Sequence, residues 1–214
     1  MKNILLPVVG MCVCSGAYAG NWYIGFGAGA VRSLDAGDNI AANRTALTQY
    51  GITNYTSSDR TGTALSLLGG YRFGRWLGAE IDYTDLGEFD LHGFAGPNHT
   101  LPVGAERDTI SLLSLDAVAA IPLGSTFAIY GKAGPTLAMV DQASCVSGIR
   151  FCDSNSDTGG ATHAAVGVRF TPDTLIGELR LDYSRYMDVD AGTNQFTGGD
   201  FNVWEVQYVY HFGD

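Results

Sequence analysis

Residues 63–84 have the sequence TALSLLGGYRFGRWLGAEIDYT, and the pattern of this stretch predicts the fold. Apolar residues such as Leu65 and Leu67 recur at every second position, and small or polar residues stand between them. Side chains of a β-strand point alternately to its two faces, so this period of two predicts strands that separate two environments. The dipeptide Gly74-Arg75 predicts a two-residue turn, and the stretch is therefore an antiparallel hairpin.

The same alternation recurs along the rest of the chain, where each predicted strand carries one apolar face. The members of that face are Trp22, Ile24, Phe26, Ala28 and Ala30; Leu65, Leu67, Tyr71 and Phe73; Leu77, Ala79, Ile81 and Tyr83; Leu113, Leu115, Ala117, Ala119 and Ile121; Phe127, Ile129, Ala133 and Leu137; Ala164, Val166, Val168 and Phe170; Leu175, Leu179, Leu181 and Tyr183; and Trp204, Val206, Tyr208, Tyr210 and Phe212. The chain is therefore expected to form eight strands.

The connections between these strands alternate in length. Short turns at 74–75, 122–125 and 172–173 follow the even-numbered strands, and long loops at 33–61, 85–108, 141–160 and 187–201 follow the odd-numbered ones. Bacterial outer-membrane barrels have short periplasmic turns and long extracellular loops. We therefore predict an all-β fold, an eight-stranded antiparallel up-and-down transmembrane barrel.

Polarity separates this prediction from a soluble barrel. Only 16% of the 214 residues are charged, against about 25% in soluble domains. The charged residues of the predicted strands lie on the face opposite the apolar one: Arg72, Glu80, Asp82, Asp116, Lys132, Arg169, Glu178, Arg180, Asp182 and Glu205. A soluble barrel would turn such residues outward. Lipid outside and four basic groups paired with six acidic groups inside fit the pattern better, because singly buried charges are costly.

Composition also excludes other classes. A transmembrane helix needs about 20 consecutive apolar residues, and the sequence contains no such stretch. The net charge of −10 argues against nucleic-acid binding, which needs clustered Lys and Arg. Eight strands enclose a space that side chains can fill, so a general diffusion porin is not expected.

Residues 1–19 have the layout of a secretory signal peptide. Lys2 gives a positive start, an apolar stretch follows at 4–13, and Ala17-Tyr18-Ala19 is a small-residue cleavage site. We expect export to the cell outer membrane, with a barrel domain over residues 20–214.

Cys145 and Cys152 remain after cleavage, seven positions apart in a segment rich in Ser, Gly, Asn and Asp. In an exported protein this spacing predicts a local disulfide. A metal site is not expected, because no histidine lies within ten residues of either cysteine.

The stretch 69–87, GGYRFGRWLGAEIDYTDLG, resembles the second hairpin of the OmpA-type outer-membrane barrels. Tyr208, Tyr210 and Phe212 resemble the aromatic C-terminal signal that the barrel-assembly machinery reads. The resemblance covers the strand pattern from residue 20 onward and implies a barrel of the small OmpX kind. We expect no peptidoglycan-binding domain, since Asp214 closely follows the last strand.

The resemblance also implies a role for Glu80, since the matching glutamate of the family belongs to an interior salt-bridge network that can switch partners. Asp182, within Leu-Asp-Tyr, is expected beside it. The sequence departs from the family at Val118, near the position of the family's fourth-strand lysine. The cationic partner must then be Arg72, Lys132 or Arg180, and the network either gates the barrel or plugs it permanently.

Function is expected in the long loops, which together carry a net charge of −10. An acidic rim argues against polyanionic ligands and fits divalent cations that bridge to lipopolysaccharide, although acidity can also serve solvation alone. We expect a monomer without cofactor that contacts outer-membrane lipid, lipopolysaccharide, periplasmic chaperones and, through its loops, host or surface ligands. Its roles would be envelope integrity and adhesion.

The alternatives are a narrow channel for ions or small solutes and an enzyme that modifies lipid A. The lipid A deacylases carry His-x-Ser on a strand, and none of the four histidines is followed by Ser at that spacing. Asp90, His92 and Ser111 could imitate the loop residues of palmitoyl-transferring barrels. Asp188-x-Asp190-x-Gly192 has part of a calcium-loop pattern but lacks its third ligand and final glutamate. No catalytic, cofactor or metal residue is therefore expected.

Overall fold

The structure is a computed structural model, and it describes residues 22–34, 52–57, 61–95, 101–146, 151–172, 176–189 and 199–212. The predicted signal peptide 1–19 lies outside these residues. In the described part of the chain, no helix is long and apolar enough to cross a membrane.

Nine β-strands make up the described secondary structure. They are β1 (Trp22–Ser33), β2 (Ile52–Ser57), β3 (Thr61–Arg72), β4 (Leu77–Ala95), β5 (Leu101–Pro122), β6 (Phe127–Val146), β7 (Phe151–Phe170), β8 (Glu178–Val189) and β9 (Gly199–Phe212). These strands pair with one another in antiparallel fashion throughout the described part of the chain.

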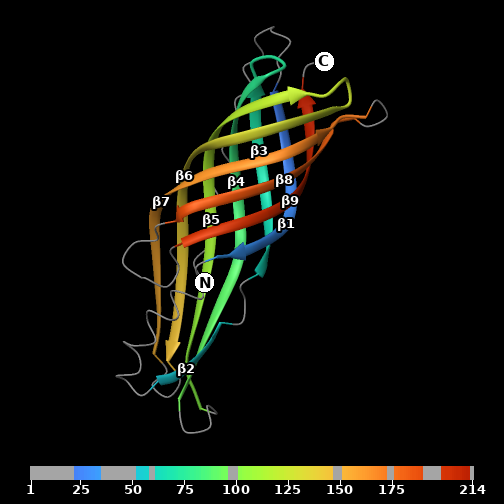
Figure 1. The fold of residues 1–214 in the computed structure, drawn as a ribbon. Helices are drawn as coiled ribbons and strands as arrows, with labels where there is room; N and C mark the ends of the chain where they lie inside the picture. Colours follow the sequence, from blue (N-terminus) through green and yellow to red (C-terminus); the bar gives the residue numbers. More distant parts are fainter. Residues whose placement is uncertain are drawn as a thin grey trace.

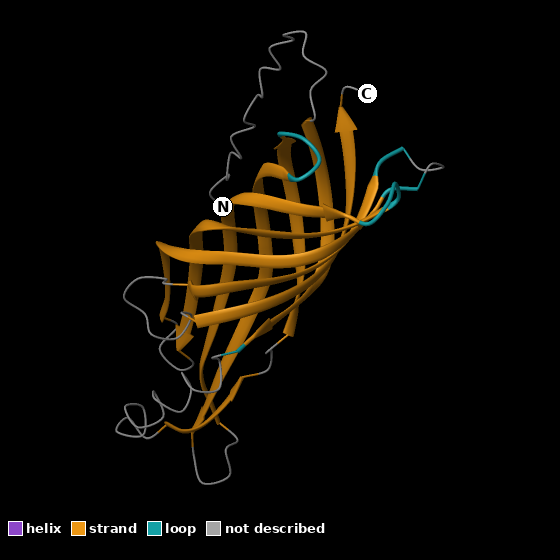
Figure 2. Ribbon diagram, turned by 45° about the horizontal axis from the view of Figure 1, so that its top comes forward, coloured by secondary structure: helices purple, strands orange, loops and turns teal. Residues whose placement is uncertain are grey.

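Eight of these strands close into a barrel, as the alternation predicted. The order around the ring is β3-β1-β9-β8-β7-β6-β5-β4, and β4 pairs with both β3 and β5, which closes it (Figures 1 and 2). The short strand β2 lies outside the ring, where it pairs with the far end of β4. The predicted fold is confirmed.

The turns that follow β3, β5 and β7 all lie at one end of the barrel, here called the short-turn end. The first covers 73–76 and is longer than the predicted 74–75, and the second covers 123–126 and is as long as the predicted 122–125. The third connects Phe170 of β7 to Glu178 of β8. Gly74, Gly124 and Gly177 have φ values of 147°, 101° and 133°, a region that glycine adopts at little cost. Each tight reversal therefore has the residue that its backbone requires.

The opposite end, here called the long-loop end, differs from the prediction. Most of the expected loops 85–108 and 141–160 is strand, because β4 extends to Ala95, β5 starts at Leu101, β6 extends to Val146 and β7 starts at Phe151. A β-bulge between Asp85 and Glu88 breaks the period of two where the prediction ended the strand. A bulge adds one residue to one strand without ending the pairing.

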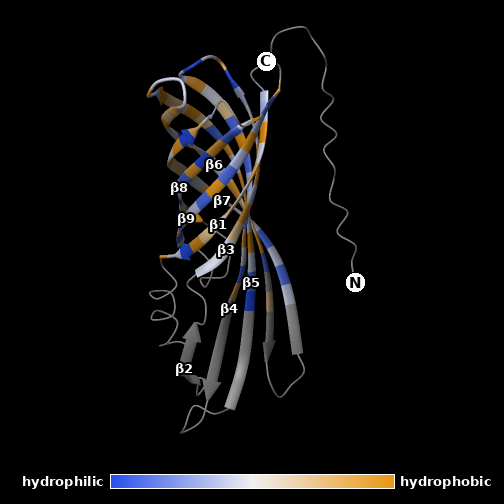
Figure 3. Ribbon diagram, turned by 90° about the vertical axis from the view of Figure 1, so that its right-hand side faces the viewer, coloured by the Kyte–Doolittle hydropathy of each residue, from blue (hydrophilic) through white to orange (hydrophobic). Residues whose placement is uncertain are grey.

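Large apolar side chains cover the outside of the barrel. Phe26, Leu67, Leu115 and Val206 are each about 60% exposed, although they belong to the centres of strands. Orange and blue therefore alternate along the strands in Figure 3. Only a lipid environment makes such a continuous apolar surface favourable. Trp22, Phe73, Trp76, Phe127 and Phe212 stand near the short-turn end, as a membrane-interface girdle requires.

The interior has two layers. Toward the long-loop end it is an apolar core, which consists of the buried residues Val31, Ala64, Leu86, Ile110, Leu112, Ala138, Val140, Tyr186, Val189, Phe201 and Val203. Toward the short-turn end it is polar and charged. The alternation of the sequence predicts the polar layer but not the apolar one.

Candidate functional site

Lys132 on β6 is the centre of the polar layer. Its Nζ lies 2.9 Å from Oε1 of Glu80, 2.8 Å from Oδ2 of Asp82 and 3.6 Å from Oδ2 of Asp182. Glu80 and Asp82 are on β4 and Asp182 is on β8, so a single ammonium group links three strands across the lumen. All four side chains are 0–1% exposed. A buried ammonium group is tolerable only with this number of charged partners.

Arg180 on β8 continues the network toward the short-turn end. Its Nη1 donates to Oε2 of Glu80 at 2.7 Å, and its Nε donates to Oε1 of Glu178 at 2.6 Å. Glu178 also accepts from Nη2 of Arg72 at 2.6 Å, and Nε of Arg169 lies 3.7 Å away. Glu80 therefore connects two cations and Glu178 connects three, and the ion pairs form one continuous network that includes residues of β3, β4, β6, β7 and β8.

Two tyrosines hold the network in position. Tyr23 donates to Oε2 of Glu80 at 3.0 Å, and Tyr130 donates to Asp182. The guanidinium of Arg180 lies between their rings, 5.0 Å and 5.3 Å from the two centroids. Gly70, which faces Tyr23 on the neighbouring strand, leaves room for that ring, since a Cβ at Gly70 would lie 2.3 Å from it.

A second polar group lies beside the first. Nδ1 of His163 on β7 is 2.8 Å from Oδ2 of Asp116 on β5, and the imidazole stacks on Tyr186 at 4.5 Å. The strand between them, β6, places Gly134 opposite His163. A Cβ at Gly134 would lie 1.9 Å from the carbonyl oxygen of Leu115, so the strands pack too closely there for any side chain.

Within the described part of the chain, Glu205 on β9 is the one acidic member of the predicted set that contacts no lysine, arginine or histidine side chain. It faces Asp182 across the β8–β9 pair, and it accepts a hydrogen bond from Nε2 of Gln207 at 3.1 Å. No group of three residues in the described ranges has the geometry of a metal site.

The structure thus places all ten sequence-predicted charged residues on the inner face, where it joins eight of them into one chain of ion pairs. Lys132 and Arg180 are the cationic partners of Glu80, and Arg72 pairs with Glu178 instead. Asp116 and Glu205 stand outside that chain. The alternation put Tyr130, His163 and Gln207 on the same face, but no sequence signal assigned them a partner.

The predicted C-terminal signal lies at the short-turn end of β9. Tyr208 donates to the carbonyl oxygen of Ile176, and Tyr210 packs edge-on against Phe212 at 5.1 Å. All three belong to the outward face, where Tyr210 and Phe212 are about two-fifths exposed.

The residues considered for catalysis are not brought together. The register pairs His92 with Ala105 on β5, and Ser111 lies six residues further along that strand, roughly 20 Å away. Asp190 and Gly192 of the partial calcium pattern lie outside the described residues.

The sequence model of the OmpA-like transmembrane domain matches residues 17–214, nearly the whole chain. The chain belongs to this family. The earlier resemblance is therefore confirmed, and the protein is an outer-membrane β-barrel. A comparison with curated proteins gives no match.

Solved structures of the same architecture are similar over most of their length. Neisserial surface protein A is 14% identical, with 92% of this chain and 99% of that one covered and a TM-score of 0.52. Ail of Yersinia pestis, solved with the heparin analogue sucrose octasulfate, is 12% identical, with 89% and 99% covered and a TM-score of 0.49. The N-terminal β-barrel domain of Pseudomonas aeruginosa OprF is 12% identical, with the same coverage and a TM-score of 0.46. At these identities the first match supports the fold alone.

Proposed function

We propose that this OmpA-like barrel is a non-enzymatic protein of the cell outer membrane that maintains the envelope and makes surface contacts through its long-loop end. The observation that carries this proposal is a sheet that extends beyond the closed barrel. β4 and β5 pair as far as Ala95 and Leu101, whereas β1 and β3 pair only as far as Arg32 and Thr61 (Figure 1).

The same extension occurs on β6 and β7. These strands pair as far as Val146 and Phe151, but β7 pairs with β8 only from Thr162 onward. In the described part of the chain, the segment 155–161 of β7 therefore pairs with β6 alone. An edge strand with unpaired backbone groups can accept an extended segment of another protein. This edge is the surface we propose for contact.

The closed interior supports a permanent plug rather than a channel. Lys132, Glu80 and Asp182 come from β6, β4 and β8 and fill the lumen between these strands, and their side chains are 0% exposed. Above them the apolar core leaves no polar path for an ion among its described residues. We infer that the network serves stability, and planar-bilayer recording should show no conductance difference between wild type and Glu80→Ala.

We expect no catalysis at the His163–Asp116 pair. His163 Nε2 has no hydrogen-bond partner among the described residues, so no hydroxyl is positioned for activation by the His163–Asp116 pair. An ester-hydrolysis assay with lipid A should give no product. Release of a fatty acid would overturn this part of the proposal.

Further parts of the proposal rest on sequence. Residues 1–19 would direct export, and Tyr208, Tyr210 and Phe212 would be read by the assembly machinery after delivery by periplasmic chaperones. The protein would be a monomer in contact with lipopolysaccharide, and Cys145 and Cys152 would be bridged.

The surface role is tested by removal of the extension without disturbance of the barrel. The register pairs Glu88 with Thr109 and Asp141 with Ser156, so Asn-Gly turns can replace 89–108 and 142–155 at paired positions. Cells with the shortened protein should adhere to epithelial cells less than cells with the full chain. A gel shift between unboiled and boiled samples checks that the shortened barrel still folds. Equal adhesion by a folded, shortened barrel would contradict the surface role.

A further inference from the structure

The short-turn end of the barrel opens into a cavity of about 690 Å³ whose lining is basic. Arg72, Arg75 and Arg169 line it, and its other described lining residues are uncharged. This volume is typical of small-molecule sites. Because the whole chain carries a net charge of −10, a cluster of arginines here is not a by-product of general basicity.

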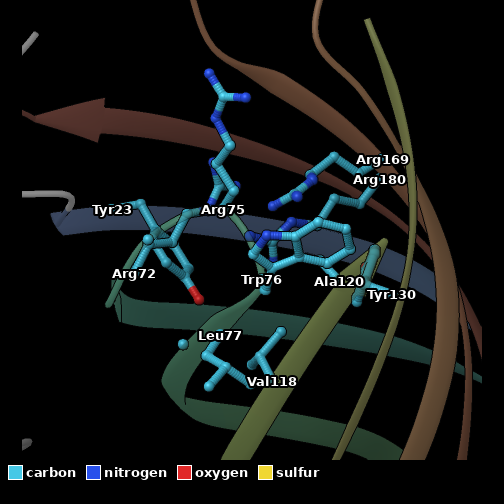
Figure 4. A pocket seen from close by; sticks show the side chains of 12 residues that line it. Tyr23, Arg72, Arg75, Trp76, Leu77, Val118, Ala120, Tyr130, Arg169 and Arg180 are labelled. Carbon is cyan, nitrogen blue, oxygen red and sulfur yellow. The ribbon is translucent and has the colours of Figure 1, made fainter. Parts of the chain in front are cut away.

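Below this cavity lies a narrower pocket that adds a fourth arginine. Figure 4 shows Arg180 with Tyr23, Trp76 and Tyr130 around it. The guanidiniums of Arg72 and Arg180 lie 5.4 Å and 5.0 Å from the centroid of the Tyr23 ring. The four arginines come from β3, the 73–76 turn, β7 and β8, so the fold itself brings them together.

In the part of the chain that the structure describes, the carboxylates near the cavity do not balance these cations. Among the described residues, Glu178 is shared by Arg72 at 2.6 Å, Arg180 at 2.6 Å and Arg169 at 3.7 Å. The last distance is too long for a hydrogen bond, and Arg75 forms no ion pair with the described part of the chain. A guanidinium has five N–H donors, so Arg75 and Arg169 keep donors available to a ligand.

From this arrangement we propose that the cavity is a binding site for a phosphate-type oxyanion, held between Arg169, Arg75 and Arg72. Guanidiniums match phosphate oxygens in a bidentate geometry, and a concave site of one charge sign concentrates counter-ions. The phosphate group could belong to a soluble molecule or to an anionic lipid headgroup. The site does not depend on the proposed surface contacts.

Trp76 lines the narrower pocket and can report binding. The chain has three tryptophans, so Trp22→Phe with Trp204→Phe leaves Trp76 as the single reporter. The protein is placed in uncharged maltoside micelles and titrated with pyrophosphate. We expect a saturable change in Trp76 fluorescence that weakens as salt increases.

Two matched substitutions test the residues. Arg169→Gln should weaken binding by about tenfold, because a charged hydrogen bond is lost. Arg32→Gln removes an exposed arginine at the other end of the barrel and should leave binding unchanged. If Arg169→Gln fails to fold, as a gel without boiling would show, Arg75→Gln in the exposed turn replaces it.

A second titration identifies the source of the phosphate. Phosphatidylglycerol or phosphatidylcholine is mixed into the micelles in place of pyrophosphate. A response to pyrophosphate supports a soluble ligand, and a response to phosphatidylglycerol alone supports a lipid headgroup. The proposal would be overturned if neither pyrophosphate nor phosphatidylglycerol changed the Trp76 fluorescence. It would also be overturned if the Arg169→Gln and Arg32→Gln proteins bound pyrophosphate with the same affinity.

Discussion

At the scale of single residues, Glu80 links the two principal cations of the lumen. Glu80→Ala would leave Nζ of Lys132 with two carboxylates and remove one of the two acceptors of Arg180. Breaking a buried ion pair costs about 3 kcal/mol, and we expect the free energy of unfolding to fall by this amount. Urea unfolding in lipid vesicles measures this free energy.

Asp200→Asn is the control substitution. The Asp200–Arg185 ion pair is 2.5 Å long and half-exposed, so it contributes less than about 1 kcal/mol. Equal effects of both substitutions would show that Glu80 has no special role.

Gly134 gives a second prediction at this scale. A Cβ at Gly134 would lie 1.9 Å from the carbonyl oxygen of Leu115, whereas a Cβ at Gly160 would meet nothing within 4 Å. Gly134→Ala should therefore destabilise the barrel by about 1–3 kcal/mol, and Gly160→Ala should not. The same unfolding assay compares them. A Gly134→Ala protein as stable as wild type would mean that β5 and β6 can separate without cost.

At the scale of elements, the β6–β7 hairpin places Cys145 directly opposite Cys152. Facing residues of antiparallel strands have Cα atoms about 4.5–5.5 Å apart, within the range that a disulfide requires. We expect the mature protein to show no alkylatable thiol until it is reduced, as mass spectrometry can measure. The double variant Cys145→Ser/Cys152→Ser is the blank for this assay. Alkylation of wild type before reduction would exclude the bridge.

The elements also show why the sequence predicted the barrel but not its length. Around Leu65 and Leu67 one face is apolar and the other polar, so the period of two is visible. Between Ile110 and Leu115 apolar residues occur on both faces, since Ile110 and Leu112 enter the interior core and Leu113 and Leu115 face outward. Because the two faces do not differ clearly in polarity there, the alternation does not predict the apolar core. The bulge after Asp85 shifts the phase as well.

The sequence predicts which charged residues belong to the network but not which of them pair with each other. The face of Glu80 and Lys132 follows from alternation along each strand. Their contact at 2.9 Å joins β4 to β6 across the lumen, and this depends on how far each strand is staggered around the ring. No local pattern encodes that stagger. The hydroxyl of Tyr23 donates to Glu80, and this contact also depends on the stagger of the strands, so the sequence does not predict it.

At the scale of the whole molecule, the central claim is a closed barrel with lipid outside and a filled interior. Such a barrel has no free strand edge within the membrane and resists detergent until it is heated. The most direct test is electrophoresis in dodecyl sulfate of the refolded protein with and without boiling. The unboiled protein should run at a different position from the boiled one, because the ring β3-β1-β9-β8-β7-β6-β5-β4 stays intact. Identical migration of the two samples would contradict the closed barrel.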